Sequence, residues 1–268
     1  MNQSPLISII TVVLNGAKYL ENAIKSVLSQ SYSKVEYIII DGGSTNGTLD
    51  IIKKYESRIS KLISEPDNGI SDAFNKGIKL ASGEIIGLLN SDDWLEPDAI
   101  KKIVKIFSSD KPDIICGAVR FWEKEKEVIV SYPDLQNLDR ETSIHHSGVF
   151  IKKSIYEKFG LFDTHLKYAM DYELLLRMKM NNVKFYLLND VVSNRRLEGI
   201  SYKNKRLALR ETMSARKNYF NIWNVWIIYL YASIKDCGGR LLKSSILKPL
   251  YITYWKLKNR KLARDPKE

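Results

Sequence analysis

The sequence is poor in cysteine and lacks the spacings of common zinc sites. Of its 268 residues only Cys116 and Cys237 are cysteines, and no CxxC pair occurs. A disulfide framework and a cysteine-based zinc site are therefore excluded. Such a chain is expected in a reducing compartment, which here indicates the cytoplasm.

The sequence also lacks the glycine-rich loops that hold phosphate in two large nucleotide-binding folds. The pattern GxxxxGKS/T is absent, and the first predicted strand is not followed by GxGxxG. If the protein binds a nucleotide, the phosphates must therefore be held mainly by a metal ion and by side chains.

No apolar run is long enough for a membrane-spanning helix. The run Ile222–Ile234 is interrupted by Asn224 and is shorter than the about twenty residues that a span requires. The earlier run Leu6–Leu14 has no Lys or Arg before it and no small-residue cleavage site after it. We therefore expect a buried strand there instead of a signal peptide, and no membrane crossing.

What the sequence does contain indicates a globular protein with a basic end. Hydrophobic residues make up 44% and charged residues 27%, which excludes a disordered, collagen-like or coiled-coil chain. The formal net charge is +11, but residues 203–268 alone hold sixteen Lys or Arg and four Asp or Glu. We therefore expect a near-neutral domain at residues 1–202 and a basic helical extension at residues 203–268.

Predicted strands and helices alternate in the N-terminal half. The predicted strands are Leu6–Leu14, Val35–Ile40, Lys61–Ser64 and Glu84–Leu89. The helices that follow them are Tyr19–Gln30, Leu49–Tyr55, Asp72–Leu80 and one opened by Pro97. This alternation predicts an α/β fold with a mostly parallel sheet flanked by helices. Farther on we expect a hairpin through Glu123–Glu127, helices at Ile155–Phe159 and Met170–Met180, and a strand at Val183–Leu188.

Polar residues gather where four of the predicted strands end. The clusters are Thr11–Gly16, Asp41–Thr48, Glu65–Gly69 and Asn90–Asp93. Asp, Asn, Ser and Gly are also ordinary turn and helix-capping residues, so each cluster alone has a structural explanation. Ligands of parallel sheets bind beyond the carboxyl ends of the strands, so four clusters on one edge favour a shared polar crevice.

The adjacent carboxylates Asp92 and Asp93 indicate a cation site. Two neighbouring carboxylates repel each other at the end of a buried strand unless a cation binds. Mg²⁺ and Mn²⁺ take one or two protein carboxylates together with phosphate oxygens of a substrate. The pair therefore predicts a divalent metal with a nucleoside diphosphate, and the alternative is a solvated pair that caps the helix near Pro97.

The motifs, taken in order, resemble the family 2 glycosyltransferases of the GT-A (Rossmann-like) fold. Ile7–Asn15 is similar to the first strand of that family, and Asp41–Thr45 resembles its "DGxS" turn. Glu65–Gly77 is similar to a longer block of bacterial polysaccharide and O-antigen transferases, and Leu88–Trp94 resembles the metal-binding DxD segment. The resemblance covers about residues 6 to 200 and implies the GT-A fold.

The resemblance also implies roles in binding the sugar donor. One group of matching positions would line the nucleotide pocket: Thr11, Val13, Asn15, Asp41 and Asp67. Asn90, Ser91 and Asp92 occupy the DxD positions, which makes Asp92 the ligand of Mn²⁺ or Mg²⁺ and places Asp93 near donor or acceptor. The first Asp of the motif is replaced by Asn90, whose amide can bind ribose but brings less charge.

Four further positions concern the acceptor and the closing loop. Asp171, in the segment Ala169–Leu174, resembles the family's "ED" segment and is implied to be the base of an inverting transfer; the alternative is that it caps its helix. His146 either faces the acceptor or packs in the core. Arg195 and Arg196 match the mobile loop over the donor, where they would neutralise diphosphate or form a solvated charge run.

The basic extension has three interpretations. Leu241–Arg264 interleaves apolar and aromatic residues with Lys and Arg, which is typical of segments that bind anionic membrane surfaces. Nucleic-acid binding is an alternative because the charge also attracts phosphate backbones, although no nucleic-acid motif is present. The third possibility is a helical pair that packs on the main domain.

The resulting hypothesis is an inverting hexosyltransferase of bacterial surface polysaccharide synthesis, such as O-antigen or capsule. It would move a sugar from a UDP-sugar to a polyprenyl-diphosphate-linked saccharide at the inner face of the cell membrane, without binding nucleic acid. The alternatives are a metal-dependent nucleotidyltransferase and a non-catalytic protein that binds a nucleotide sugar or nucleic acid. Metal-dependent release of UDP would separate the first hypothesis from these alternatives.

Overall fold

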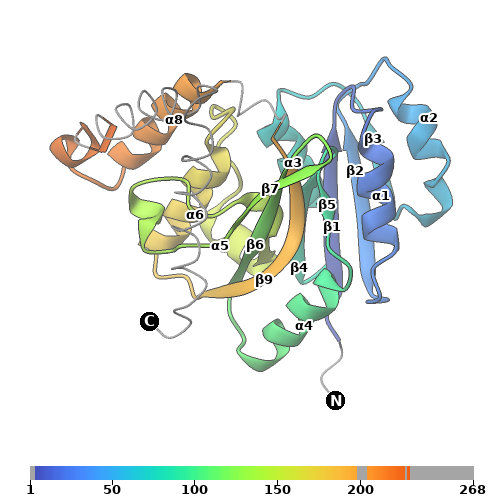
Figure 1. Cartoon of the computed structure of the whole chain (residues 1–268), viewed down its shortest axis with the longest axis horizontal. Coiled ribbons are helices and arrows are strands. Elements are labelled where there is room, and N and C mark those ends of the chain that lie inside the picture. The colour runs from blue at the N-terminus through green and yellow to red at the C-terminus, as the bar shows by residue number, and fades with distance from the viewer. Residues whose placement is uncertain (1–3, 198–203, 227, 230–268) are drawn as a thin grey trace.

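One nine-stranded sheet runs through the residues that the computed structural model describes, which are 4–197, 204–226 and 228–229 (Figure 1). The strands are β1 Ile7–Val13, β2 Val35–Asp41, β3 Lys61–Ser64, β4 Ile85–Asn90, β5 Trp94–Leu95, β6 Ile114–Glu123, β7 Lys126–Ser131, β8 Val149–Lys152 and β9 Phe185–Arg196. Their order across the sheet is β3-β2-β1-β4-β8-β6-β9-β5, and β7 pairs with β6.

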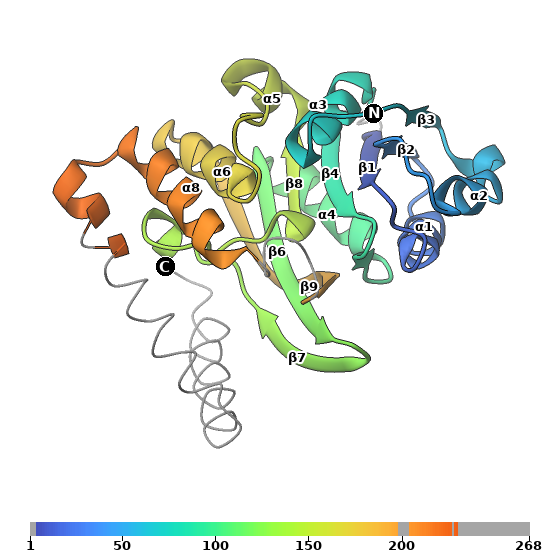
Figure 2. The same ribbon diagram turned by 90° about the horizontal axis from the view of Figure 1, so that it is seen from above.

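Helices cover both faces of this sheet (Figures 1 and 2). They are α1 Leu20–Leu28, α2 Thr48–Lys53, α3 Ile70–Leu80, α4 Ala99–Ser109, α5 Lys153–Phe159, α6 Met170–Met180 and α8 Lys205–Lys217. Three short 3-10 turns lie at Glu56–Arg58, Asn137–Asp139 and His146–Gly148. The helix expected to open at Pro97 begins at Ala99, because Asp98 before it adopts a left-handed backbone with φ of 58°.

The N-terminal half of the sheet is parallel, as the alternation of strands and helices predicted. β1 pairs in parallel with β2 and with β4, and β2 pairs in parallel with β3. The registers place Val13 beside Asp41, Val12 beside Asn90, and Asp41 beside Ser64. The polar clusters that follow these strands therefore begin at the same edge of the sheet.

The remaining strands make the sheet mixed. β8 is antiparallel to β4 and β6, whereas β9 is parallel to β6. The expected hairpin is confirmed: β6 and β7 are antiparallel and turn after Glu123, which pairs with Lys126. β9 is longer than expected and includes Arg195 and Arg196, which pair with Phe121 and Trp122. The prediction that these two arginines lie in a loop is therefore wrong.

The sheet is buried on both faces, which explains its continuous apolar strands. In β1, Ile10 and Val12 pack in the core layer that contains α3 and α6. Ile9 and Val13 point the other way and pack in the layer that contains α1 and α4. Each fully buried aliphatic side chain of this size stabilises the fold by about 1.5–3 kcal/mol. The strands that carry the polar clusters at their carboxyl ends are therefore held between two apolar core layers.

The predicted basic extension is described only in its first part. α8 lies beside α6 in both views, and its Ala215 is buried in the same core layer as Met170 and Leu174 (Figures 1 and 2). The segment Leu241–Arg264 lies outside the described residues, so the domain boundary at residue 202 stays a prediction. Among the described helices, none has the length and apolar character needed to cross a membrane.

Candidate active site

Asp41 stands at the centre of the predicted nucleotide-binding edge. Its side chain is fully buried, and Oδ2 accepts hydrogen bonds from the Gly43 N–H (3.2 Å), the Ser44 N–H (3.1 Å) and the Ser64 hydroxyl (2.7 Å). Oδ1 is buried and has no hydrogen-bond partner within the described part of the chain. An unpaired buried carboxylate oxygen is costly, and an N–H group of a ligand would remove that cost.

Asn15 ties the end of β1 to the loop after β2. Its backbone N–H donates to the Ser44 hydroxyl over 2.8 Å, and its Oδ1 accepts the Thr45 N–H over 2.9 Å. Asn15 has a left-handed φ of 53°, which asparagine tolerates better than most residues. The neighbouring Leu14 is 58% exposed, although the apolar pattern of the strand predicted a buried side chain. An apolar surface therefore lies next to the polar edge.

Asp67 approaches this edge from the loop after β3. Its Oδ1 accepts the Gly69 N–H over 2.8 Å. A Cβ atom on Gly42 would collide with Asp67 Oδ2, so glycine at this position lets the carboxylate come close to the backbone. Thr11 and Val13, which the sequence predicted in the pocket, are 0% and 4% exposed. Of the five residues predicted to line the nucleotide pocket, Asn15 and Asp67 therefore have accessible side chains, and the contact of Thr11 and Val13 with a nucleotide stays a prediction.

The segment after β4 holds the two adjacent carboxylates in different environments. Asp93 is 1% exposed, and its oxygens accept the Arg196 N–H (3.2 Å) and the Asn90 Nδ2–H (3.3 Å). Its burial leaves Asp93 little surface for the contact with a sugar donor that the sequence predicted, and that contact stays a prediction. Asp92 is only partly buried. Ser91 lies against the turn after β1, where a Cβ on Gly16 would be 2.9 Å from its Oγ.

A divalent cation fits this segment only together with a substrate. Burial, and then the charge of neighbouring Asp92, raise the pKa of Asp93 to about 8, so Asp93 largely keeps its proton at neutral pH. A cation bound beside the pair would favour loss of that proton. Within the described residues, no group of three or more His, Cys, Asp or Glu side chains is arranged to hold a metal ion. The donor set therefore suits Mg²⁺ or Mn²⁺ that binds Asp92 and takes its other ligands from a diphosphate and water.

A hydrogen-bonded chain connects this segment to Asp171 at the start of α6. Asn90 Nδ2 lies 3.0 Å from His146 Nε2, and His146 Nδ1 lies 3.2 Å from Asp171 Oδ2. Since the Asn90 amide nitrogen donates, Nε2 accepts and Nδ1 carries the proton that is donated to Asp171. His146 therefore lies between the end of β4 and the start of α6 and contacts the candidate base. Its ring is 8% exposed and both nitrogens have partners, so contact with an acceptor stays a prediction.

Asp171 is held as a carboxylate in a poorly solvated place. Its side chain is 15% exposed. Burial acts to raise the pKa of Asp171, but the hydrogen bond from His146 and the positive charge of Arg195 outweigh it and hold the pKa below its usual value. Asp171 is therefore ionised at neutral pH and able to accept a proton.

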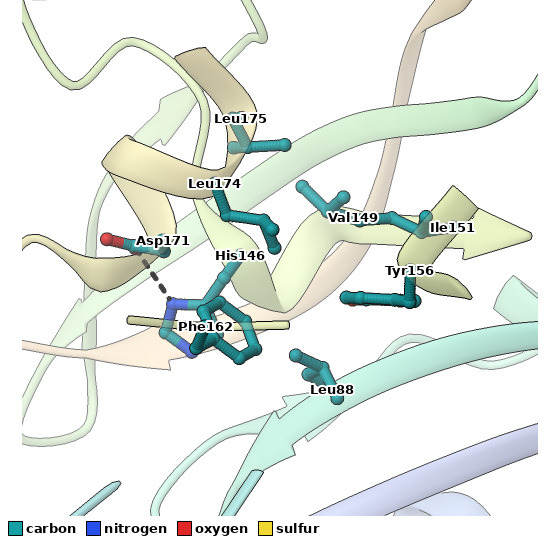
Figure 3. A pocket seen from close by; sticks show the side chains of 9 residues that line it. All are labelled: Leu88, His146, Val149, Ile151, Tyr156, Phe162, Asp171, Leu174 and Leu175. Atoms are coloured by element: carbon teal, nitrogen blue, oxygen red, sulfur yellow. Dashed lines mark hydrogen bonds and ion pairs between the residues drawn. The ribbon is translucent and has the colours of Figure 1, made fainter. Parts of the chain in front are cut away.

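Figure 3 shows Asp171 and His146 joined at one end of a group of apolar side chains. These side chains enclose a cavity of about 10 Å³. It is lined by Leu88, His146, Val149, Ile151, Tyr156, Phe162, Asp171, Leu174 and Leu175. A cavity of this size holds at most about one water molecule. A sugar hydroxyl must therefore reach Asp171 from outside the cavity.

Replacing His146 with phenylalanine is expected to move the acid limb of the pH profile of kcat/KM to higher pH. The variant removes the hydrogen bond that lowers the pKa of Asp171 and leaves the burial that raises it. Turnover at neutral pH should also fall about tenfold, the value of one hydrogen bond to a charged group. His165→Phe is the control, because the side chain of His165 is 94% exposed and bonds only to Asp163 among the described contacts. An acid limb that stays in place would contradict this role.

The structure separates the two predicted arginines. Arg196 is 7% exposed, and its guanidinium lies 4.1 Å from the Tyr19 ring centre and 4.7 Å from that of Trp94. Arg195 is only partly buried, and its charge influences the pKa of Asp93 and of Asp171. The Arg195 guanidinium also lies near a ring, 5.9 Å from the centre of Phe121, but Arg195 is the more exposed of the two arginines. Contact of Arg195 with an anionic substrate stays a prediction.

His145 takes no part in the contacts of Asp171. Its Nε2 lies 3.2 Å from the Ser131 hydroxyl, and its ring packs edge-on against Phe121. Burial lowers its pKa to about 3, so the ring is neutral at physiological pH. The two adjacent histidines thus contact different neighbours, His145 the Ser131 hydroxyl and His146 the Asp171 carboxylate.

Solved structures of similar fold are glycosyltransferases. A mannosyltransferase from Pyrobaculum calidifontis, in complex with GDP-Man and Mn²⁺, matches with a TM-score of 0.66 at 17% identity, over 96% of this chain and 88% of that one. Residues 1–349 of S. aureus TarS, in complex with UDP-GlcNAc, match with a TM-score of 0.64 at 16% identity, over 84% of this chain and 70% of that one. The fold is therefore the GT-A glycosyltransferase fold.

The chain belongs to glycosyl transferase family 2, whose sequence pattern matches residues 8–163. Hyaluronan synthase of Pasteurella multocida is 30% identical over 232 residues, which are 84% of this chain and 23% of that protein. An uncharacterized glycosyltransferase of Rickettsia typhi is 34% identical over 197 residues, which are 68% of this chain and 61% of that protein. The chain thus spans less than two thirds of the length of these relatives. Membership of the family supports glycosyl transfer over the nucleotidyl transfer that the sequence had left open.

Proposed function

We propose that the protein transfers a sugar, with inversion at the anomeric carbon, from a UDP-sugar to a hydroxyl of a lipid-linked saccharide. The observation that carries the proposal is the ionised carboxylate of Asp171, held by His146 and linked through Asn90 to the edge where the β-strands end. UDP-GlcNAc bound to the structural neighbour TarS supports a UDP-sugar. GDP-Man in the mannosyltransferase makes a GDP-sugar the alternative to be tested.

The proposed reaction needs one proton acceptor and one charged leaving group. The Asp171 carboxylate removes the proton from the acceptor hydroxyl as its oxygen bonds to the anomeric carbon. The bond between that carbon and the diphosphate oxygen breaks on the opposite face, so the configuration inverts. The electron pair leaves with UDP, whose negative charge faces Arg195. A bound Mg²⁺ or Mn²⁺ at Asp92 would neutralise charge on the same diphosphate.

The proposed activity can be tested with a panel of nucleotide sugars. We expect UDP release from one or more UDP-sugars in the presence of Mn²⁺ or Mg²⁺, and loss of that release when the metal is chelated. GDP-sugars serve as the comparison for the nucleotide, and a saccharide carried on a short polyprenyl diphosphate serves as acceptor. Release from GDP-sugars alone would replace the proposed donor, and no release from any nucleotide sugar would contradict the proposed activity.

Association with the inner face of the membrane is part of this proposal. The last described residues, 222–226 and 228–229, include exposed apolar side chains. Trp223 is 77% exposed and Trp226 is 51% exposed. They lie three residues apart in the helical segment 222–226 and therefore on one side of it. Residues 203–268 hold sixteen Lys or Arg. Tryptophan beside basic charge is typical of surfaces that bind anionic lipid headgroups.

We expect the protein to co-sediment with anionic liposomes, less with neutral ones, and less as salt is raised. Exposed charges are screened over about 8 Å at physiological ionic strength, so the electrostatic part must weaken with salt. The double variant Trp223→Ala/Trp226→Ala should lower the affinity about tenfold or more, because each buried indole contributes at least about 1.5 kcal/mol. Leu62→Ala is the control, since Leu62 is exposed on β3. Equal binding to neutral and anionic vesicles would contradict the electrostatic attraction.

A further inference from the structure

The N-cap position of helix α6, which carries Asp171, has no capping side chain. The residue there is Ala169, and no side chain at that position bonds to the first turn. The first N–H groups of a helix have no backbone partner inside the helix. Asp171 Oδ1 accepts one of them, the Tyr172 N–H, over 2.8 Å, and the Ala169 N–H is left to another part of the protein.

Glu211 of α8 supplies that partner from 42 residues farther along the chain. Its Oε2 accepts hydrogen bonds from the backbone N–H groups of Ala169 (2.9 Å), Tyr168 (2.7 Å) and Lys167 (3.0 Å). Its Oε1 lies 3.1 Å from the same Lys167 nitrogen. One carboxylate thus holds three successive amides, and the last of them is two residues before Asp171.

The other side of the same loop is held by α3. The Ser71 hydroxyl donates to the Leu166 carbonyl over 2.7 Å. The Asn75 side chain donates to the Phe162 carbonyl (2.9 Å) and accepts the Phe162 N–H (3.0 Å). Ser71 and Asn75 are 3% and 7% exposed. The loop that leads to Asp171 is therefore fixed between α3 and α8.

Glu211 is itself held in place by the packing of α8. Ala215, one turn farther along α8, is 3% exposed and packs in the core layer that contains α6. The next residue, Arg216, is 2% exposed and donates to the Arg140 carbonyl over 3.1 Å. Because α8 is anchored in this way, the Glu211 carboxylate has a fixed position relative to the sheet.

We propose that Glu211 is a positioning residue for the base Asp171, so that α8 is needed for catalysis and not only for folding. The proposal rests on the proposed function, in which Asp171 removes the proton of the acceptor. Glu211 touches no reacting atom; it sets where α6 begins and hence where the Asp171 carboxylate meets His146. Residues 8–163 match the family pattern, so Glu211 lies in a part of the chain to which the pattern assigns nothing. A displacement of about 1 Å at a reacting group can cost about 100-fold in rate.

The test replaces Glu211 with glutamine in the full-length protein. The variant keeps the size of the side chain, but it removes the charge and turns one amide-accepting oxygen into an NH₂ group that opposes the loop N–H groups. Arg210→Gln is the matched control, because Arg210 is the exposed neighbour on α8 and the variant also changes one charge. Turnover is measured with the donor and acceptor that release most UDP, UDP affinity is measured with Mn²⁺, and the melting temperature establishes that the protein is folded at the assay temperature.

We expect Glu211→Gln to lower kcat about 10- to 100-fold. The affinity for UDP with Mn²⁺ should stay within about twofold, since the predicted nucleotide-binding edge is formed by the ends of β-strands and not by α6 or α8. Backbone amides of residues 167–169 should exchange hydrogen faster, while those of β1 keep their protection. Ser71→Ala, which removes one hydroxyl on the other side of the loop, should lower kcat in the same way but less. Unchanged kcat in a folded Glu211→Gln variant would overturn the proposal.

A double variant distinguishes positioning from a general structural effect. If Glu211 acts through Asp171, then Glu211→Gln has no further effect on the residual turnover of Asp171→Asn. If Glu211→Gln lowers that residual turnover by the same factor as in the wild type, the effect does not pass through Asp171 and the proposal is overturned. Near-normal turnover of Asp171→Asn alone would instead contradict the proposed function, so the two failures can be told apart.

Discussion

Replacing Asp171 with asparagine is expected to lower turnover about 10²- to 10⁴-fold, the usual contribution of a general base. Asparagine has nearly the same shape and can still accept the hydrogen bond from His146 through its amide oxygen, but it cannot take up the acceptor proton. The affinity for UDP should not change, because Asp171 lies on α6 and the nucleotide edge is formed by the ends of β1, β2 and β4. Steady-state kinetics and calorimetry with UDP and Mn²⁺ measure the two effects separately.

Asp190→Asn is the control for Asp171→Asn. Asp190 is an exposed carboxylate on β9 that pairs with Lys102, and its loss should leave turnover within about twofold. The stereochemistry of the product is an independent check, because NMR should show inversion at the anomeric carbon. If Asp171→Asn kept near-normal turnover, Asp171 would return to the capping role that its place at the start of α6 also allows.

The parallel half of the fold could be predicted because both of its faces are buried. In Ile9–Val13 and Ile38–Ile40, apolar side chains pack in both core layers, so these parts of the strands are rich in β-branched residues without a polar face. Lys61–Ser64 and Met170–Met180 have the bounds that the sequence predicted. The helical spacing of apolar residues and the short polar connections were sufficient to predict the helices and strands of this parallel half.

The end of β9 could not be predicted from local pattern. Asn189 and Asp190 interrupt the apolar run after Leu188, which is typical of the end of a strand. In the structure the register shifts there: Leu188 pairs with Gly117 and Val191 pairs with Ala118, so the two polar residues are left out of the pairing. The strand then continues to Arg196, which is why two arginines assigned to a loop lie on the sheet.

The sequence indicated which polar residues gather at the candidate site, but it did not indicate which of them contact one another. Strand order brings the polar clusters to one edge, and this followed from the alternation of elements. The link from Asn90 through His146 to Asp171 joins residues that are 56 and 25 positions apart, and no local signal indicates such a pairing. The contact of Glu211 with the loop before α6 is hidden for the same reason. Thr11 and Val13 matched the family pattern, but their side chains are buried in β1, so their contact with a nucleotide stays a prediction.

Replacing Asp92 with alanine is expected to remove the metal-dependent part of UDP binding. Of the two adjacent carboxylates, Asp93 has both oxygens bonded within the protein, whereas Asp92 is partly exposed at the edge where the diphosphate would lie. An interaction with a charged group contributes about 1.5–3 kcal/mol, so affinity for UDP with Mn²⁺ should fall about 10- to 100-fold. Affinity for UDP without metal should stay the same, because the family resemblance places the nucleoside at other residues, among them Asp41 and Asp67.

The fold should tolerate this change, since the side chain of Asp92 is not part of either core layer. Asp110→Ala is the control: Asp110 is an exposed carboxylate after α4, so its loss should alter neither metal-dependent nor metal-free binding. Calorimetric titration of UDP with and without Mn²⁺ compares the variants, and the melting temperature verifies that each is folded. Removal of Asp92 also removes the repulsion that helps to raise the pKa of Asp93. If Asp92→Ala bound UDP with Mn²⁺ as tightly as the wild type, Asp92 would not be the metal ligand, and Asp93, freed from that repulsion, would be the carboxylate to replace next.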